Sequence, residues 1–240
     1  MFGRRTPPGG KNVQAYVMKS IGETGFVDKE RPEAGPNDAV VRPTKALVCT
    51  SDVHTVGGAI GEREDITLGH EAVGIVHEVG EEVEHFESGD RVSVGAITPN
   101  WGSLAAQDGH PSQSREALGG WKFANVKDGV FAEYFHVNEA DANMAHIPSS
   151  VSDEAAVYVT DMMSTGFSAA EKGRIPVGGT VAVFAQGPVG LMATKGAACA
   201  GRGPSSPSKP FPSDRSWPGS TVQMRSWITP RWMSSRPSST

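Results

Sequence analysis

Residues 69–80 read Gly-His-Glu-Ala-Val-Gly-Ile-Val-His-Glu-Val-Gly, and the interpretation of the fold starts from this stretch. It is rich in Val and Ile and alternates in part between apolar and polar positions, which predicts a β-strand. Its first residues also carry an imidazole at His70 and a carboxylate at Glu71. The stretch therefore predicts both a strand of a β-sheet and two possible metal ligands at the start of that strand.

Several other short apolar runs flank this strand and are separated by turns. The predicted strands cover residues 15–20, 38–48, 90–97 and 129–137, with a loop between the first two at residues 30–38. Many short strands and few helices predict a compact β-barrel-like domain that extends to about residue 148. Residues 97–127 are a long, polar, Gly-containing excursion, and such loops are usually functional or binding elements.

The pattern changes after this domain. Residues 152–173 have helical spacing, with Ser152 as a plausible N-cap and Glu154 close behind it. Residues 178–201 then read as an apolar strand, a tight Gly turn and a helix rich in Ala and Gly. This order predicts the opening βα unit of a dinucleotide-binding fold.

Composition limits the classes of partner. No run of about 18 apolar residues exists, so the sequence predicts no membrane span, and the basic start lacks the apolar core of a signal peptide. Cys49 and Cys199 are too few for a disulfide framework and favour a reducing, cytoplasmic location. Residues 1–200 carry a net charge of −10, which argues against nucleic acid as a partner.

The last 40 residues have a different composition. Residues 201–240 contain 11 Ser, 7 Pro and three of the five Trp, with a net charge of +5. No period of two or of 3.6 residues survives there, so no packed core is predicted from this segment.

Chemistry is suggested by Cys49-Thr50-Ser51-Asp52-Val53-His54, which lies 21 residues before the His-Glu pair. Thiolate, imidazole and carboxylate are zinc ligands, and a catalytic zinc keeps one position open. Taken alone, a Cys and a His at this separation are weak support, because a core Cys or a structural His is commoner. Ser51 and His54 are suited to carrying a proton from an alcohol to solvent.

Several segments together resemble the zinc-dependent medium-chain alcohol dehydrogenases, and most closely the microbial secondary-alcohol dehydrogenases. The resemblance covers about residues 16–200 with few gaps. The segments that carry it, in order, are CTSDVH (49–54), GHEAVG (69–74), GDRV (89–92), TPNW (98–101), GGWKF (119–123), DGVFAEYFHV (128–137) and TDMMSTGF (160–167).

The resemblance implies a ligand set for one catalytic zinc. Cys49, His70 and Asp161 would hold the ion, Glu71 would be an occasional fourth or near ligand, and Asp52 would orient His70 from behind. Larger relatives hold a second, structural zinc with four clustered cysteines. The sequence has no such cluster, so one zinc is expected.

The resemblance also implies a reaction: hydride transfer from an alcohol to NAD or NADP, with zinc as Lewis acid. Ser51 would take the hydroxyl proton and pass it towards His54. Further site residues carry over from the family. The substrate pocket corresponds to Ala96, Ile97 and Trp121, although Trp121 could equally be ordinary loop packing; the cofactor site corresponds to Thr165, Ala185, Gly187, Pro188, Val189 and Gly190.

Ala185 departs from the usual G-x-G-x-x-G pattern, in which a Gly occupies the first position. The loop nevertheless follows an apolar run and opens a helix, whose N-terminus would receive the pyrophosphate.

The expected fold is α/β: a β-rich, barrel-like GroES-like catalytic domain followed by the incomplete start of a Rossmann cofactor domain. We expect residues 1–15 to be a flexible tail, 16–165 the catalytic domain, 166–203 the first part of the cofactor domain, and 204–240 a disordered tail. The family resemblance also implies a homotetramer, although its usual interface elements are partly missing. The partner class is a small-molecule alcohol or carbonyl compound.

We hypothesise that the final segment is a frameshifted reading that begins between about Ala200 and Pro204. Back-translation of the segment around Trp217 and Trp227 allows sheet-like strings in a neighbouring frame, and a glutamate in that frame hints at NAD in the parent. Two alternatives therefore stay open: a non-catalytic zinc-binding fragment, and a zinc-free reductase of the same superfamily. Sequencing the DNA around this point tests the hypothesis, and an uninterrupted gene with no sheet-like sequence in its other frames would contradict it.

Overall fold

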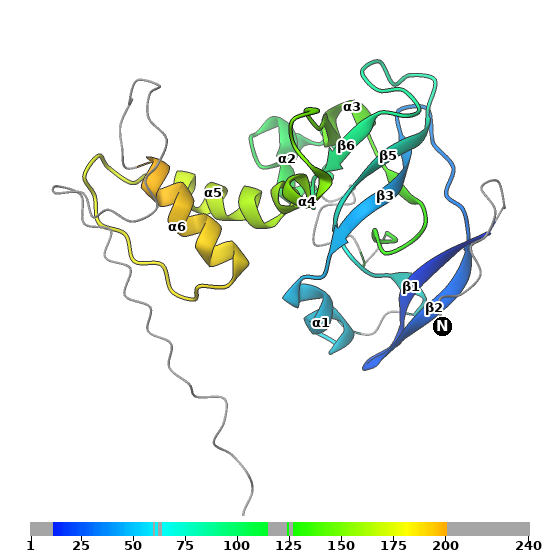
Figure 1. The fold of residues 1–240 in the computed structure, drawn as a ribbon, viewed down its shortest axis with the longest axis horizontal. Coiled ribbons are helices and arrows are strands. Elements are labelled where there is room, and N and C mark those ends of the chain that lie inside the picture. The colour runs from blue at the N-terminus through cyan, green and yellow to red at the C-terminus, as the bar shows by residue number, and fades with distance from the viewer. Residues whose placement is uncertain (1–11, 60, 62–63, 115–123, 125–126, 201–240) are drawn as a thin grey trace, which may run out of the picture. The chain divides into compact units, whose positions relative to one another are not determined.

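The computed structural model describes residues 12–59, 61, 64–114, 124 and 127–200, so the predicted frameshifted tail lies outside the described residues. The chain divides into two compact units, Met1–Asp161 and Met162–Thr240, whereas the sequence placed this boundary after residue 165. Figure 1 shows sheets in the first unit and a pair of helices in the second. Each unit is described by itself.

The larger sheet of the first unit has five antiparallel strands in the order β7-β3-β5-β6-β8. These strands are β3 (Ala39–Leu47), β5 (Glu71–Val79), β6 (Arg91–Val94), β7 (Phe135–Val137) and β8 (Met144–His146). The strand predicted from residues 69–80 is thus β5, and it lies in the middle of this sheet. The register pairs Leu47 with Glu71, so the end of β3 meets the start of β5.

The smaller sheet has the order β2-β1-β4. Its strands are β1 (Asn12–Ser20), β2 (Glu23–Glu30) and β4 (Ile66–Thr67). Val13, Ala15 and Val17 alternate into the interior along β1, as a strand with one buried face requires. β1 begins at Asn12, so residues 12–15 are strand rather than part of the predicted flexible tail.

One buried cluster fills the space beside the larger sheet. Its members are Ala39, Val41, Ala72, Val76, Phe86, Val92, Val94, Val130, Phe135, Val137, Ala140 and Met144. Most of these side chains are β-branched or small, which suits close packing on a pleated surface. The β-rich N-terminal domain predicted from the sequence is therefore confirmed.

The strand predicted over residues 129–137 is shorter than expected, because the segment serves both sheets in turn. The Phe131 carbonyl accepts a hydrogen bond from Tyr16 N–H in the smaller sheet. Only Phe135–Val137 then pairs with β3 in the larger one. The predicted strand over 90–97 is likewise shorter and covers only Arg91–Val94.

Short helices connect the strands of the first unit. They are α1 (Thr50–Val56), α2 (Leu104–Gln107), the 3₁₀ turn η1 (Pro111–Gln113), α3 (Ala140–Asn143), α4 (Asp153–Ala156) and the 3₁₀ turn η3 (Val157–Val159). The predicted excursion over residues 97–127 thus contains α2 and η1 among its described residues. No described helix combines the length and the apolar character that crossing a bilayer needs.

The helical run predicted over residues 152–173 is confirmed in large part, but it is interrupted at residues 160–161. Ser152 does cap α4, since its Oγ accepts a hydrogen bond from Ala155 N–H at 3.3 Å. The Thr160 carbonyl then accepts a hydrogen bond from Ala96 N–H at 2.9 Å instead of from a later residue of the same helix. This diversion ends the run before helix α5 (Met162–Lys172) begins in the second unit.

The second unit contains α5 and α6 (Pro188–Ala200), which pack against each other. The helix predicted after the Gly turn is α6. The strand predicted before that turn is wrong, because residues 179–186 have no regular structure. A strand needs a neighbour to satisfy its backbone, and no described residue pairs with this run. Phe184 is consequently 91% exposed.

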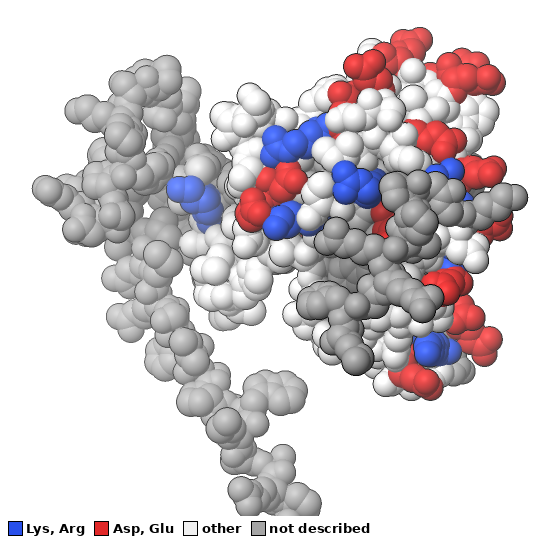
Figure 2. Space-filling model, turned by 45° about the vertical axis from the view of Figure 1, so that its right-hand side comes forward, with Lys and Arg blue, Asp and Glu red and all other residues white. Residues whose placement is uncertain are grey.

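Acidic side chains lie on the surface of the first unit, including a run of six acids between Glu78 and Asp90. Figure 2 shows Asp and Glu gathered over this unit. Within the run, Glu81, Glu82, Glu84 and Glu87 are exposed, so they form a solvated face.

Asp153 ties α4 to the larger sheet. Its carboxylate accepts hydrogen bonds from Thr44 Oγ1 at 2.5 Å and from Arg91 Nε at 2.6 Å. Arg91 also donates through Nη2 to the Val151 carbonyl. The hydrogen bond from Thr44 has the largest effect and the bond from Arg91 the next largest, and together they hold the pKa of Asp153 below its usual value.

Replacing Asp153 with Asn is therefore expected to weaken the fold by roughly 1 to 2 kcal/mol at neutral pH. Because the pKa of Asp153 is lower in the folded state than in the unfolded state, the ionised carboxylate stabilises the fold. This stabilisation is complete above the unfolded-state pKa, near 3.8, and it is lost as the pH falls through the folded-state pKa. The loss caused by the substitution should therefore shrink below about pH 4. Urea unfolding of both proteins from pH 3 to 7 measures this, and a pH-independent difference would contradict it.

Candidate metal centre

Cys49 is presented at the start of helix α1, two residues after β3 ends. Its backbone is extended (φ −91°, ψ 155°) and it occupies the N-cap position. Its N–H donates a hydrogen bond to Asp52 Oδ2 at 2.8 Å. An acid three residues after the N-cap commonly makes this bond, because the first N–H groups of a helix have no partners inside it.

His70 and Glu71 stand at the junction where β5 begins. Gly69 makes this junction possible, because its φ is +86°, a conformation that residues with a Cβ rarely adopt. A Cβ at Gly69 would also lie 2.4 Å from a ring carbon of Phe131. The Gly therefore sets the direction in which the next two side chains leave the strand.

Replacing Gly69 with Ala is expected to destabilise the first unit by roughly 2 to 4 kcal/mol, because backbone strain and overpacking add at one position. Gly89 is a matched control, since its φ is +102° but a Cβ there meets no atom of the described residues within 4 Å. Thermal unfolding of the two Ala variants should show the larger loss at Gly69. Equal losses would mean that the contact with Phe131 contributes nothing.

Asp161 lies between η3 and α5, at the end of the first unit. The bond from Ala96 N–H to the Thr160 carbonyl fixes the residue immediately before it. The interruption of the predicted helix thus places this carboxylate beside the sheet, where β5 begins.

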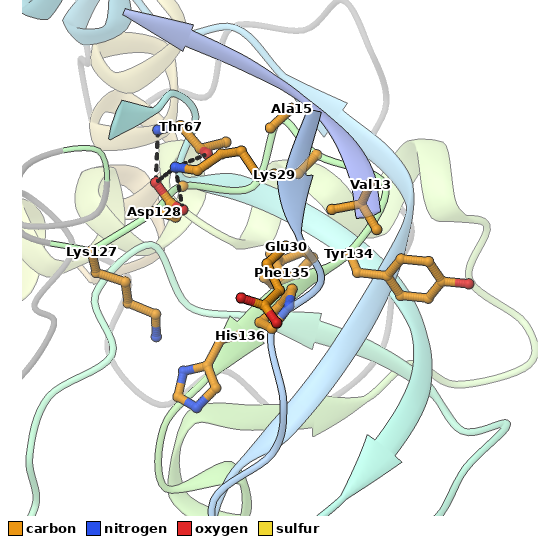
Figure 3. Close-up of a pocket in the computed structure, with 13 residues that line it drawn as sticks. Val13, Ala15, Lys29, Glu30, Thr67, Lys127, Asp128, Tyr134, Phe135 and His136 are labelled. Carbon is orange, nitrogen blue, oxygen red and sulfur yellow. Dashed lines mark hydrogen bonds and ion pairs between the residues drawn. The ribbon is translucent and has the colours of Figure 1, made fainter. Parts of the chain in front are cut away.

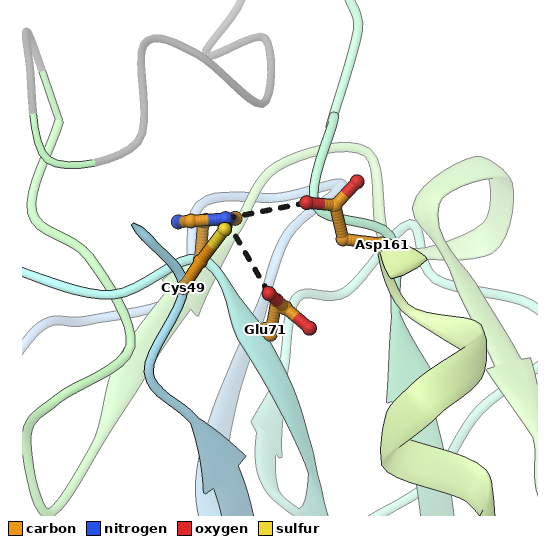
Figure 4. Close-up of side chains that lie close together, drawn as sticks. Cys49, Glu71 and Asp161 are labelled. Atoms are coloured by element: carbon orange, nitrogen blue, oxygen red, sulfur yellow. Dashed lines mark ion pairs between the residues drawn. The ribbon is translucent and has the colours of Figure 1, made fainter. Parts of the chain in front are cut away.

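Cys49, His70, Glu71 and Asp161 converge on one point. Each offers a ligand atom, and these atoms all lie within 4.8 Å of one another. Figure 4 shows the Cys49 sulfur and the carboxylates of Glu71 and Asp161 directed towards one another. His70 Nε2 is 3.4 Å from Asp161 Oδ2 and 3.7 Å from Glu71 Oε1.

Asp52 supports two of these residues at once. One carboxylate oxygen accepts from Cys49 N–H, and the other lies 3.3 Å from His70 Nδ1. With Nδ1 facing Asp52, Nε2 is the nitrogen that faces the other three ligands. A carboxylate behind a ligating imidazole fixes its orientation in this way. The bond to Cys49 is an addition to the role predicted from the sequence.

The donor set fits a zinc ion, and Glu71 gives the strongest test of that fit. Its side chain is 0% exposed, yet neither of its carboxylate oxygens has a hydrogen-bond partner among the residues that the structure describes. A buried carboxylate without partners is costly, and a cation beside it removes the cost. A thiolate, an imidazole and carboxylates are ligands that suit zinc, whereas a thiolate disfavours magnesium and calcium.

The electrostatics of the cluster show the same need for positive charge. Burial raises the pKa of Glu71 to about 7, and the charge of Asp161 adds to this effect. Burial works to lower the pKa of His70, but hydrogen bonds to Asp161 and Asp52 outweigh it and raise that pKa to about 10. Protons thus supply the positive charge that a divalent cation would supply here.

The predicted proton carriers lie on α1. Ser51 Oγ is 3.5 Å from His70 Nε2, so it borders the ligand cluster. His54 follows three residues later on the same helix, a spacing that brings two side chains to one face. Both residues are exposed, so a proton passing along them reaches solvent.

Of the three predicted substrate residues, the structure describes Ala96 and Ile97. Ala96 is buried and bonds to the residue next to Asp161, so it lies close to the cluster. Ile97 is 41% exposed. Trp121 lies outside the described residues.

The predicted cofactor residues belong to the second unit. Thr165 is in α5, and the Ala185–Gly190 loop leads into α6 at Pro188. Ala185 has φ +67°, which explains why Gly is usual at its position. At Gly190 a Cβ would lie 1.9 Å from the Ala185 carbonyl oxygen, so this turn requires Gly there.

Comparison with known proteins agrees with this arrangement. Residues 35–149 match the alcohol dehydrogenase GroES-like domain. The chain is 56% identical to an NADP-dependent isopropanol dehydrogenase of Thermoanaerobacter brockii, over 80% of this chain and 54% of the relative. It is 52% identical to the protein of the same name from Clostridium beijerinckii, over 80% of this chain and 55% of that relative. The chain therefore spans about half the length of the curated relatives it matches.

Solved structures give the same result. Zinc-dependent alcohol dehydrogenase 2 from Streptococcus pneumonia, in its apo form, has a TM-score of 0.71 at 35% identity, covering 78% of this chain and 53% of the other. An alcohol dehydrogenase from Thermus sp. ATN1 has a TM-score of 0.72 at 30% identity, covering 79% and 56%.

Proposed function

Because the chain belongs to the zinc-dependent medium-chain alcohol dehydrogenase family, we propose that it holds one catalytic zinc ion and takes part in oxidising a small secondary alcohol with NADP. The observation that carries the proposal is the convergence of four ligand atoms within 4.8 Å, one of them from a buried carboxylate that accepts no hydrogen bond from the described residues. The relatives named NADP-dependent isopropanol dehydrogenase support the alcohol and the cofactor. They favour NADP over the NAD suggested by the shifted reading frame.

Cys49, His70 and Asp161 would hold the ion, with Glu71 as fourth or alternating ligand. When bound, zinc supplies a Lewis acid that lowers the pKa of an alcohol hydroxyl, so that the hydroxyl proton leaves near neutral pH. Asp52 keeps the imidazole of His70 oriented and so preserves the direction of Nε2.

Ser51 would accept the hydroxyl proton, and the 3.5 Å between its Oγ and His70 Nε2 supports this role. His54, on the same face of α1, passes that proton to solvent. A bound nicotinamide cofactor would supply the hydride acceptor, because this chemistry belongs to the cofactor itself. Thr165 and the Ala185–Gly190 loop would bind that cofactor, with the start of α6 facing its pyrophosphate.

The substrate is a small neutral alcohol or the corresponding carbonyl compound. Ala96, Ile97 and Trp121 would line its pocket, and the apolar character of all three suits a short aliphatic group. Assembly into a homotetramer stays a prediction from the family.

A second candidate is a zinc-binding protein without dehydrogenase activity. One observation favours it: residues 179–186 have no partner strand among the described residues. Such a protein would retain the metal centre, because all four ligands belong to the first unit. A zinc-free reductase is disfavoured by the same four ligands.

Zinc content per chain, together with oxidation of 2-propanol by NADP⁺ or NAD⁺, separates the candidates. Turnover that is lost on chelation and restored by zinc supports the dehydrogenase. One zinc without turnover supports the non-catalytic candidate. Folded protein that takes up no zinc would overturn the ligand assignment and both zinc-based candidates.

A further inference from the structure

The chain that leads into the metal ligand His70 is held from the side by residues 128–131, which we call the clasp. The carbonyls of residues 67, 68 and 69 each accept a hydrogen bond from a clasp N–H, at 2.8, 2.9 and 3.0 Å. The donors are residues 129, 131 and 130 in that order. The three carbonyls immediately before His70 are therefore fixed by one neighbouring segment, to which the reaction proposed above gives no role.

The contact between the two segments depends on glycine on both sides. A Cβ at Gly129 would lie 2.2 Å from the Gly69 carbonyl oxygen, so only Gly lets the segments come this close. Gly69 has φ +86° and, being a glycine, is free to adopt other conformations as well. Glycine thus allows the turn before His70 but does not restrict it, and the bonds from the clasp supply the restriction.

Asp128 anchors the clasp through its carboxylate. Its Oδ1 accepts hydrogen bonds from Thr67 N–H at 2.9 Å and from Lys29 Nζ at 2.7 Å, and its Oδ2 lies 2.6 Å from the same Nζ. Lys29 Nζ also donates to the Asp65 carbonyl at 2.8 Å. Figure 3, a view of the pocket that these side chains border, shows Lys29, Thr67 and Asp128 joined by dashed lines. One carboxylate thus ties the clasp to β2 and β4, just before the chain reaches His70.

We propose, on the basis of the zinc site inferred above, that Asp128 is a positioning residue that acts through the clasp on His70 and Glu71. A binding site requires its groups to be held within about 0.5 Å of their working positions. The side chains of Lys29 and Asp128 are 25% and 47% exposed, and ion pairs this exposed contribute little to overall stability. Loss of Asp128 should therefore affect the metal centre more than the stability of the fold.

Zinc affinity of the full chain, measured against a chromophoric chelator, tests the proposal. Asp128→Ala should bind zinc about tenfold more weakly than the parent, which is the low end of the range for residues that support a metal ligand. Asp128→Asn should bind zinc like the parent, because its amide oxygen remains an acceptor for Thr67 and Lys29. Lys29→Met leaves Asp128 bonded to Thr67, so it should weaken zinc binding in the same direction and by less.

Asp141→Ala is the matched control, because the Asp141 carboxylate also accepts hydrogen bonds from the backbone, from Glu84 N–H at 2.8 Å and His85 N–H at 2.9 Å. Those two residues lie between β5 and β6 and adjoin none of the four ligands in the chain, so zinc affinity should stay unchanged. Bound Co²⁺ gives a second measurement, because its visible absorption depends on the arrangement of its ligands. Asp128→Ala should shift these absorption bands, whereas a variant that only loosens the fold should not.

An Asp128→Ala variant that is folded and matches the parent in both zinc affinity and Co²⁺ absorption would overturn the proposal and leave the zinc site standing. An equal loss of affinity at Asp141→Ala would also overturn it, because the effect would then be a general loosening of the fold. If Asp128→Ala does not fold, Lys29→Met decides in the same way. A parent that binds neither ion would contradict the proposed zinc site itself.

Discussion

Cys49→Ser is expected to lower the affinity for zinc by at least about a hundredfold. The thiolate is the softest donor in the cluster, and a serine hydroxyl at the same place does not ionise near neutral pH. Replacing a residue that only hydrogen-bonds a metal ligand typically lowers the metal affinity about 10- to 100-fold, and replacing a ligand itself should lower it further. The loss should come without unfolding, because the hydrogen bond from Cys49 N–H to the Asp52 carboxylate involves the backbone, which the substitution retains.

The chain provides its own control for this substitution. Cys199 is the other cysteine, and it is exposed on α6 in the second unit. Cys199→Ser should leave zinc affinity unchanged when both variants are titrated against a chromophoric zinc chelator. Zinc binding that survives at Cys49→Ser, or that falls equally at Cys199→Ser, would remove Cys49 from the ligand set.

Glu71→Met is expected to have opposite effects on the two forms of the protein. Without metal the variant should be more stable than the parent by roughly 1 to 3 kcal/mol, because it replaces a fully buried carboxylate that accepts no hydrogen bond from any described residue. With zinc present the order should reverse. The parent alone then has all four ligands, and binding to the folded state stabilises it in proportion to affinity.

Chemical denaturation with and without saturating zinc measures both effects. Glu81→Met is the matched control, since Glu81 is exposed and its replacement should change either form by less than about 0.5 kcal/mol. A metal-free Glu71→Met variant that is less stable than its parent would show that Glu71 has a structural role independent of a cation.

Several strands could be predicted because local patterns determine them, whereas the ligand set came from the resemblance to the family. Residues 69–80 alternate and are β-branched, and β5 forms there. Ser152 has the composition of an N-cap and acts as one. The Cys-x-x-Asp spacing at residues 49–52 also indicates a helix N-terminus, because an acid three residues after an N-cap accepts a hydrogen bond from the N–H of the cap residue. The role predicted for Asp52 was only the orientation of His70 from behind.

Other features depend on contacts between distant segments and had no local signal. The interruption of the predicted helix depends on the bond between Ala96 and Thr160, which are 64 residues apart. The orphaned oxygens of Glu71 depend on packing around β5. The strand predicted before Gln186 had the right composition, but a strand also requires a neighbour, and none of the described residues supplies one.

X-ray absorption at the zinc edge, on the purified full chain, tests the central claim most directly. The account predicts about one zinc per chain, with one sulfur ligand near 2.3 Å and the remaining nitrogen and oxygen ligands near 2.0–2.2 Å. Cys49→Ser should remove the sulfur component. A folded chain that holds no zinc, or zinc without a sulfur ligand, would contradict the metal centre described above.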